Sequence, residues 1–137
     1  MITMPAGRYY VGDLCYVMHP QWDEFCEKTI SGNDVISGLV EFASGVKVAQ
    51  FSTYYGDGTY EDDSGRMYAV DAGLIGCIRV EDINDPSMEG EAEMKRLGNI
   101  IEFKTDFECS EDDGVLYFGD VVIDTKGSED YDEGIED

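Results

Sequence analysis

TYYGDGTYEDDSGRMYAVDAGLIGCI, residues 53–78, is the stretch of the sequence that decides the fold. Tyrosines and other strand-forming residues flank a polar tip at residues 61–65, Glu-Asp-Asp-Ser-Gly. Because Asp, Ser and Gly between two strand-like runs supply turn geometry, the pattern predicts a β-hairpin. A buried strand over residues 74–80 is expected to continue from it.

Strands are also predicted on both sides of this hairpin. Residues 7–17 are predicted as a strand interrupted at Gly12-Asp13, because a glycine inside a strand usually marks a bulge or a close backbone approach. Four further segments have the composition of strands and are joined in pairs by turns at 43–45 and 110–114: 35–42 with 46–55, and 100–109 with 115–124.

Two helical segments complete the predicted fold. Residues 21–30 carry an apolar stripe with helical spacing, formed by Trp22, Phe25, Cys26 and Thr29. Pro86 could start a second helix over 86–97, although Gly90 leaves an ordered loop as the alternative. The fold class is therefore α+β: mainly antiparallel β-sheet, as a sandwich or partly closed barrel, with one N-terminal helix and a short second helical segment.

The length of 137 residues corresponds to a single domain, which we expect to span residues 1–125. Residues 126–137 form an acidic tail that is expected to be flexible. No apolar run approaches the ~18 residues that span a bilayer, and the start of the chain lacks the pattern of a signal peptide. The expected location is the cytoplasm, where the four cysteines would be buried thiols.

Net charge is the strongest global feature of the sequence. There are 31 acidic and 9 basic residues, which give a formal charge of −22. Residues 1–80 hold 11 acidic and 5 basic residues (net −6), whereas residues 81–137 hold 20 and 4 (net −16). Such a field repels nucleic acids and anionic membranes and attracts basic protein surfaces. Plain solubility, or adaptation to salt, is the alternative explanation of the charge.

Catalytic and cofactor-binding patterns are missing from the sequence. His19 is the only histidine, and it lies before Pro20 at an ordinary turn position. No phosphate-binding glycine motif occurs, and no cofactor is expected. Four aspartates next to a glycine or the Ala72-Gly73 pair could form a divalent-metal site, although turn and backbone hydrogen bonding is the favoured explanation: Asp13, Asp57, Asp71 and Asp120.

Asp71 is the most unusual single position, because it lies within an apolar run that is expected to be buried. A buried carboxylate needs a partner or its pKa rises, and Arg66, Arg79 or backbone N–H groups could supply one. Asp71 also belongs to an alternative small-ligand site, in which tyrosines stack on a ligand such as a nucleotide signal. The residues of that site would be Tyr10, Tyr55, Arg66 and Asp71, with further stacking by Tyr9, Tyr54, Tyr60 and Tyr68.

PAGRYYVGDLCYVM (residues 5–18) and WDEFC (22–26), together with the stretch at 53–78, resemble a family of small uncharacterised proteins of tailed phages and some bacteria. The resemblance covers roughly residues 5–30 and 53–78. It implies a phage or prophage source and the cytoplasm of the infected cell, and it brings no catalytic residues.

Three functional hypotheses follow. The first is a non-enzymatic acidic inhibitor, with DNA mimicry as one form, that blocks a basic surface of a host or defence protein. Its binding residues would be the acids of the tail together with six acids in the last two predicted strands and the turn between them: Glu108, Glu111, Asp112, Asp113, Asp120 and Asp124. The second is the small-ligand binder, and the third is a metal-dependent enzyme built on the aspartates. The oligomeric state and the partner's identity are left open by the sequence.

Overall fold

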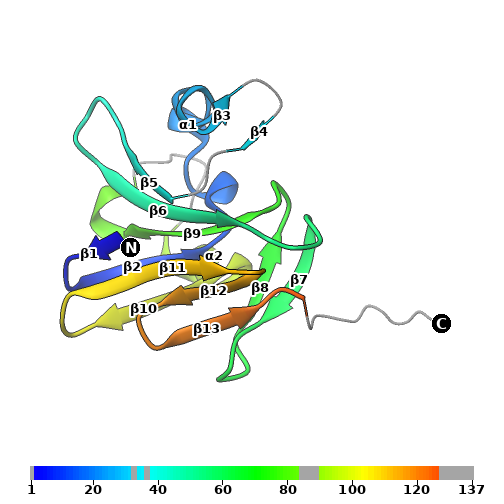
Figure 1. Cartoon of the computed structure of the whole chain (residues 1–137). Helices are drawn as coiled ribbons and strands as arrows, with labels where there is room; N and C mark the ends of the chain where they lie inside the picture. Colours follow the sequence, from blue (N-terminus) through cyan, green and yellow to red (C-terminus); the bar gives the residue numbers. More distant parts are fainter. Residues whose placement is uncertain (1, 32–33, 36–37, 84–89, 127–137) are drawn as a thin grey trace.

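A computed structural model describes residues 2–31, 34–35, 38–83 and 90–126, and it has the architecture of an antiparallel α+β sandwich (Figure 1). The predicted fold class is confirmed, and of its two forms the sandwich is the one observed, because the sheets do not close into a barrel. Residues 127–137, the predicted flexible tail, lie outside the described residues.

Two main sheets form the sandwich, and every strand pair in them is antiparallel. The four-stranded sheet consists, in spatial order, of β1 (Ile2–Met4), β11 (Phe107–Asp112), β12 (Val115–Phe118) and β13 (Val121–Asp124). The five-stranded sheet consists of β10 (Asn99–Phe103), β2 (Gly7–Gly12), β9 (Leu74–Arg79), β6 (Lys47–Ser52) and β5 (Gly38–Glu41). Two short pairs are separate: β7 (Gly58–Glu61) with β8 (Met67–Val70), and β3 (Ile30–Ser31) with β4 (Asp34–Val35).

A bent two-stranded ladder passes from one sheet to the other. β1 pairs with β11 in the four-stranded sheet, and β2 pairs with β10 in the five-stranded sheet. Between the two halves, Pro5 and Ala6 face three residues, 104–106, so one strand carries an extra residue. An extra residue bends a ladder, which is how strands turn the corner of a sandwich. The Ala6 N–H donates to Asp106 Oδ1 at 3.0 Å and fixes this corner.

Several predicted strands are shorter than expected or are divided. The single strand predicted over 100–109 is wrong, because the corner divides it into β10 and β11. The strand predicted over 115–124 is also two strands, since Gly119 has a φ of 61° and begins a two-residue hairpin turn between β12 and β13. The strand predicted over 7–17 ends at Gly12, where Asp13 caps the 3-10 helix η1 (Leu14–Tyr16). The hairpin predicted between 35–42 and 46–55 is confirmed as β5–β6, although β5 covers only Gly38–Glu41 and Val35 belongs to β4.

The hairpin at the centre of the sequence is confirmed as β7–β8, with its polar tip at residues 62–66. β9 does not extend it: the chain bends at 71–73, and β9 enters the five-stranded sheet between β2 and β6. The hairpin stands across the end of the sandwich (Figure 1), and its tip reaches β13 through a bridge between Asp62 and Ile123.

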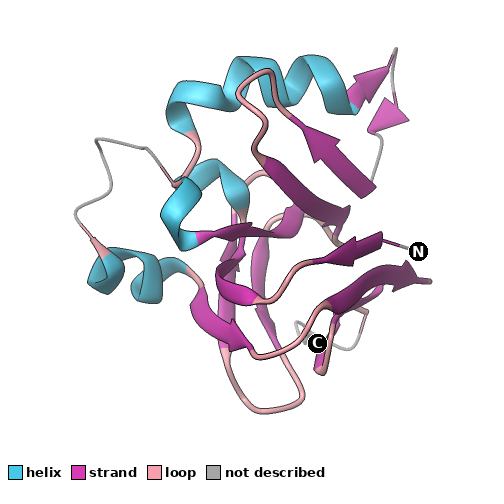
Figure 2. Cartoon of the chain, turned by 90° about the vertical axis from the view of Figure 1, so that its left-hand side faces the viewer, coloured by secondary structure: helices cyan, strands magenta, loops and turns pink. Residues whose placement is uncertain are grey.

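Helices lie on the outer side of the five-stranded sheet (Figure 2). The first predicted helix is confirmed as α1 (Trp22–Thr29), with Phe25 and Thr29 buried. The second is confirmed in part as α2 (Glu91–Leu97), and residues 86–89 of its predicted range lie outside the described residues. Two short 3-10 helices complete the described elements: η2 (His19–Gln21) and η3 (Val80–Asp82). None of the described helices is both long and apolar enough to cross a membrane.

Two apolar layers hold these elements together. The first lies between the sheets and beneath the β7–β8 hairpin, and its largest members include Tyr9, Tyr68, Ile75, Phe118 and Ile123. The second lies between the five-stranded sheet and the helices, and it includes Tyr10, Leu14, Phe25, Ile78 and Met94. The four-stranded sheet therefore buries one face and leaves its other face to solvent, as its alternating buried and exposed residues show.

Candidate functional site

The buried carboxylate near the end of the central stretch belongs to Asp13, whereas Asp71 is exposed. Asp13 Oδ2 accepts hydrogen bonds from the backbone N–H groups of Asp71 at 2.7 Å and Ala72 at 2.6 Å, and its Oδ1 accepts one from Cys15 N–H at 3.0 Å. The sequence left the burial of Asp71 open, and in the structure this residue is exposed although Val70 and Leu74 on either side are buried. The bend at 71–73 turns the Asp71 side chain to solvent. The Asp71 backbone N–H is hydrogen-bonded by the Asp13 carboxylate, 58 residues earlier in the chain.

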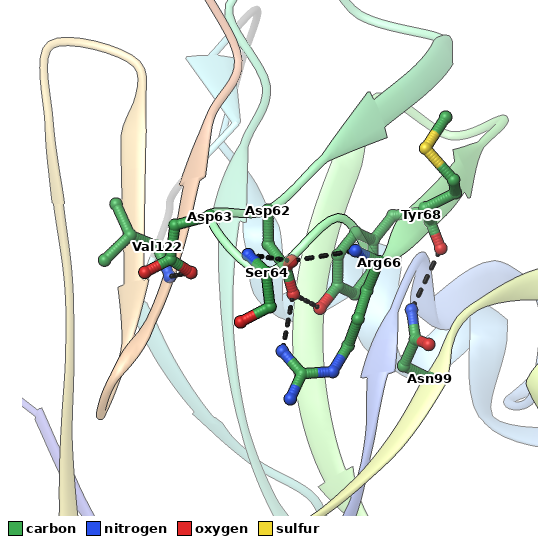
Figure 3. A network of polar contacts seen from close by, with 8 residues as sticks. Asp62, Asp63, Ser64, Arg66, Tyr68, Asn99 and Val122 are labelled. Atoms are coloured by element: carbon green, nitrogen blue, oxygen red, sulfur yellow. Dashed lines mark hydrogen bonds and ion pairs between the residues drawn. The ribbon is translucent and has the colours of Figure 1, made fainter.

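A second buried carboxylate, Asp62, organises the tip of the β7–β8 hairpin (Figure 3). Its Oδ2 accepts hydrogen bonds from Tyr68 Oη at 2.7 Å and Arg66 Nη1 at 2.9 Å, and its Oδ1 accepts two backbone N–H groups, from Ser64 and Arg66. Burial opposes ionisation of Asp62, but these four donors outweigh it and lower the pKa of the carboxyl group. Both polar networks fix the backbone, and every carboxylate oxygen in them is already hydrogen-bonded.

The predicted small-ligand residues do not converge. Tyr10 is fully buried in the layer beneath the helices, where its hydroxyl donates to the Asp13 carbonyl at 3.1 Å. Arg66 is held by Asp62, and Tyr55 and Asp71 are exposed. The additional stacking residues Tyr9, Tyr60 and Tyr68 are also buried in the apolar core. These buried tyrosines fill the interior and are not available as stacking surfaces.

The four aspartates of the metal alternative do not gather into one site, although the Asp71 N–H donates to Asp13. Asp13 is buried and satisfied by backbone donors, Asp57 precedes β7, and Asp120 lies in the β12–β13 turn of the other sheet. Among the residues that the structure describes, no three His, Cys, Asp or Glu side chains gather closely enough to hold a metal ion.

The six predicted partner-binding acids fall into two groups at opposite ends of β11. Glu111, Asp112, Asp113 and Asp124 lie around the β11–β12 turn, where Asp112 and Asp124 both face Val115 across the strands. Asp113 and Gly114 have φ values of 51° and 86°, the backbone that a two-residue Asp-Gly turn requires. Glu111 Oε2 accepts the Gly114 N–H at 2.9 Å, and Asp113 Oδ2 lies 3.0 Å from Lys126 Nζ. The remaining two acids, Glu108 and Asp120, lie at the other end of the strand.

Two exposed tyrosines adjoin the first group of acids. Tyr54 and Tyr55 are 56% and 60% exposed, and their rings meet edge to face with centroids 5.0 Å apart. A Cβ atom at Gly114 would lie 3.0 Å from the Tyr54 ring, so this ring packs directly over the β11–β12 turn. We refer to Tyr54, Tyr55, Glu111, Asp112, Asp113 and Asp124 as the tyrosine–acid end.

The composition around these two tyrosines does not separate them from the buried ones. All of them occur beside strand formers and glycines, and only the packing decides which rings are covered. One available signal was the pair Tyr54-Tyr55 followed by Gly56-Asp57-Gly58, because a glycine-rich connection usually lies on the surface.

A groove of about 770 Å³ lies at the other end of β11. It contains both remaining acids of the predicted set, Glu108 and Asp120, together with the stacked rings of Phe103 and Phe107. The structure thus divides the predicted acids between an aromatic surface at one end and a concave site at the other.

The four cysteines are free thiols. Cys77 and Cys109 are buried as expected, whereas Cys15 and Cys26 are only partly buried. Burial raises the pKa of the Cys77 thiol, and the neighbouring Cys109 thiol on the facing sheet raises it further. These thiols are part of the apolar layer between the sheets.

Comparison of the chain with protein-family models, with curated proteins and with solved structures gives no match.

Proposed function

We propose that this protein is a non-enzymatic acidic binding protein whose tyrosine–acid end occupies a basic surface of a partner protein. The observation that carries the proposal is the pair of exposed tyrosines held beside four carboxylates. Tyrosine is enriched among residues that dominate binding energy, because it brings a large apolar area with a polar tip at low conformational cost. Carboxylates around such an anchor steer a basic partner and exclude acidic ones.

The net charge of −22 supports the same proposal. Long-range attraction between oppositely charged surfaces raises association rates and weakens as salt is added. A more specific form is DNA mimicry, in which the acids take the place of phosphates on a nucleic-acid-binding partner. The resemblance to phage proteins suggests a bacterial host or defence protein as that partner, with inhibition in the host cytoplasm as the outcome.

The test is affinity capture from a bacterial lysate at about 50 mM and 500 mM salt, followed by binding measurements with the purified partner. A double variant, Tyr54→Ala with Tyr55→Ala, should weaken binding at least about tenfold, since truncating a central tyrosine typically costs more than about 1.4 kcal/mol. Leu39→Ala is the control, because Leu39 is also an exposed large apolar residue (51%) and lies on β5, the edge strand of the five-stranded sheet. It should leave binding unchanged.

Equal binding by the double variant and the wild type would contradict the proposal, and so would the absence of any captured partner at low salt. The form of the proposal that invokes DNA mimicry is tested with duplex DNA as a competitor. DNA should displace the protein from its partner, and simultaneous binding of both would rule out mimicry.

A further inference from the structure

The groove at the corner between the two sheets, which we call the corner groove, is formed where the bent ladder crosses the sandwich. Residues 101–108 make one wall, the β12–β13 turn at 119–121 makes another, and Ser64 and Arg66 of the β7–β8 tip close it. Its volume of about 770 Å³ lies within the range of roughly 300–1,000 Å³ that is usual for ligand pockets.

Stacked aromatic rings give the corner groove a fixed apolar surface. Phe103 and Phe107 are stacked with ring centroids 3.7 Å apart at an interplanar angle of 12°. Phe107 is buried and meets the Tyr9 ring edge-on at 5.0 Å, while Phe103 is only half-buried. A Cβ atom at Gly119 would lie 3.1 Å from Phe107 and 3.2 Å from the Phe103 ring, so the turn approaches the rings closely because it has glycine there.

Charge in the corner groove favours a cation. Four acidic residues line it, Glu102, Asp106, Glu108 and Asp120, against two basic residues, Arg66 and Lys104. The Arg66 guanidinium is already bound by the buried Asp62 carboxylate at 2.9 Å. Asp106 uses Oδ1 to accept the Ala6 N–H, whereas Glu108 and Asp120 are exposed on adjoining segments, where Gly119 N–H donates to the Glu108 carbonyl.

We propose that the corner groove binds an arginine side chain presented by an extended basic segment of a partner protein. A guanidinium group is planar, remains charged and donates in a fork that matches carboxylates, which suits the pair Glu108 and Asp120. Its apolar stem would pack against the half-buried Phe103, so that the arginine is bound along its whole length. Anionic ligands are disfavoured by the excess of acids in the lining.

The inference rests on the proposed function in one respect, that the partner carries positively charged residues. The two sites themselves are made of different residues. Glu108 and Asp112 are four residues apart on β11, which corresponds to about 13 Å along an extended strand. A basic partner could therefore contact both ends of the strand, but each contact can be removed separately.

The test is titration of the ¹⁵N-labelled full chain with the blocked peptide Ala-Arg-Ala-Arg-Ala, followed by NMR. We expect saturable shifts at the amides of 103–108 and 119–121, and none with the peptide in which citrulline, an uncharged analogue, replaces arginine. Glu108→Gln with Asp120→Asn should weaken binding at least about tenfold, through the loss of charge-assisted hydrogen bonds. The charge-matched control at the other end of β11, Glu111→Gln with Asp112→Asn, should change it less than about twofold.

Three results would overturn this inference: no saturable shifts, equal binding of the citrulline peptide, or equal weakening by the two double variants. The last would mean that net charge alone attracts the peptide. Tyr54→Ala with Tyr55→Ala should leave the peptide affinity unchanged. Failure of the corner groove is thus distinguishable from failure of the tyrosine–acid end.

Discussion

The backbone N–H of Tyr54 donates a hydrogen bond to the Thr125 hydroxyl at 2.9 Å, although the two residues are 71 positions apart in the sequence. The same hydroxyl donates to the carbonyl of Gly114, and Thr125 is fully buried. The Thr125 side chain therefore connects the segment that carries Tyr54, the β11–β12 turn and the end of β13. This relationship is what holds the exposed tyrosines next to the acids.

Replacing Thr125 by valine should loosen the tyrosine–acid end. Valine matches the shape of threonine but leaves the Tyr54 N–H without its acceptor, and an unsatisfied polar group costs about 1–3 kcal/mol. We expect that loss in the free energy of unfolding, measured with urea, together with weaker partner binding. Thr125→Ser keeps the hydroxyl and should retain most of both. A valine variant as stable as the wild type would show that this hydrogen bond contributes little.

Asp13 and Asp71 should respond to mutation in opposite ways. The Asp13 carboxylate accepts three backbone N–H groups. In Asp13→Asn the NH₂ group of the new amide is itself a donor, so it would face backbone N–H groups that need an acceptor. We expect a loss of about 2–4 kcal/mol in the free energy of unfolding. Asp71→Asn should stay within about 0.5 kcal/mol of wild type, since its side chain is exposed. Equal effects of the two substitutions would contradict the assignment of Asp13 as the structural carboxylate.

Asp62 should contribute stability that depends on pH. Its pKa is lower in the folded protein than the ordinary value of about 4 in the unfolded chain, so the unfolded chain takes up the proton first as the pH falls. The contribution is complete above about pH 5 and is lost progressively as the pH falls through the folded pKa. Asp62→Asn should lower stability at pH 7 and flatten its decline below pH 5, measured by urea unfolding.

Glu61→Gln is the control for Asp62→Asn, because Glu61 is the preceding residue and is exposed. It should leave the pH profile nearly unchanged. A profile for Asp62→Asn that parallels the wild type from pH 2.5 to pH 7 would exclude Asp62 as a source of acid sensitivity.

The thiols should differ in reactivity in the folded state. Cys77 and Cys109 are fully buried, and burial raises the pKa of Cys77, so both should resist alkylation by iodoacetamide in native buffer. Cys15 and Cys26 are partly exposed and should react first, although burial also raises the pKa of both. Peptide mass spectrometry over a time course gives the order, and labelling in urea provides the control. Early labelling of Cys109 would contradict the packing of the two sheets.

Local sequence patterns determined the elements whose cause is local. The apolar stripe of α1, the Asp/Ser/Gly tip of the β7–β8 hairpin and the Asp113-Gly114 turn depend on residues a few positions apart. Antiparallel α+β architecture followed from the same patterns. The division of the predicted strand 100–109 into β10 and β11 could not be predicted from local patterns. It depends on residues 104–106 facing only two residues, Pro5 and Ala6, in a partner segment far away in the sequence.

The candidate sites depended on tertiary structure to a greater degree. The sequence by itself determined the acidic character of the protein and the six acids of its C-terminal strands. Only the folded chain decided which acids lie beside Tyr54 and Tyr55, which line the corner groove, and that Asp13 and not Asp71 is buried. The physical reason is that burial and hydrogen-bond partners are properties of contacts between segments far apart in sequence, whereas charge and turn geometry are carried by the residues themselves.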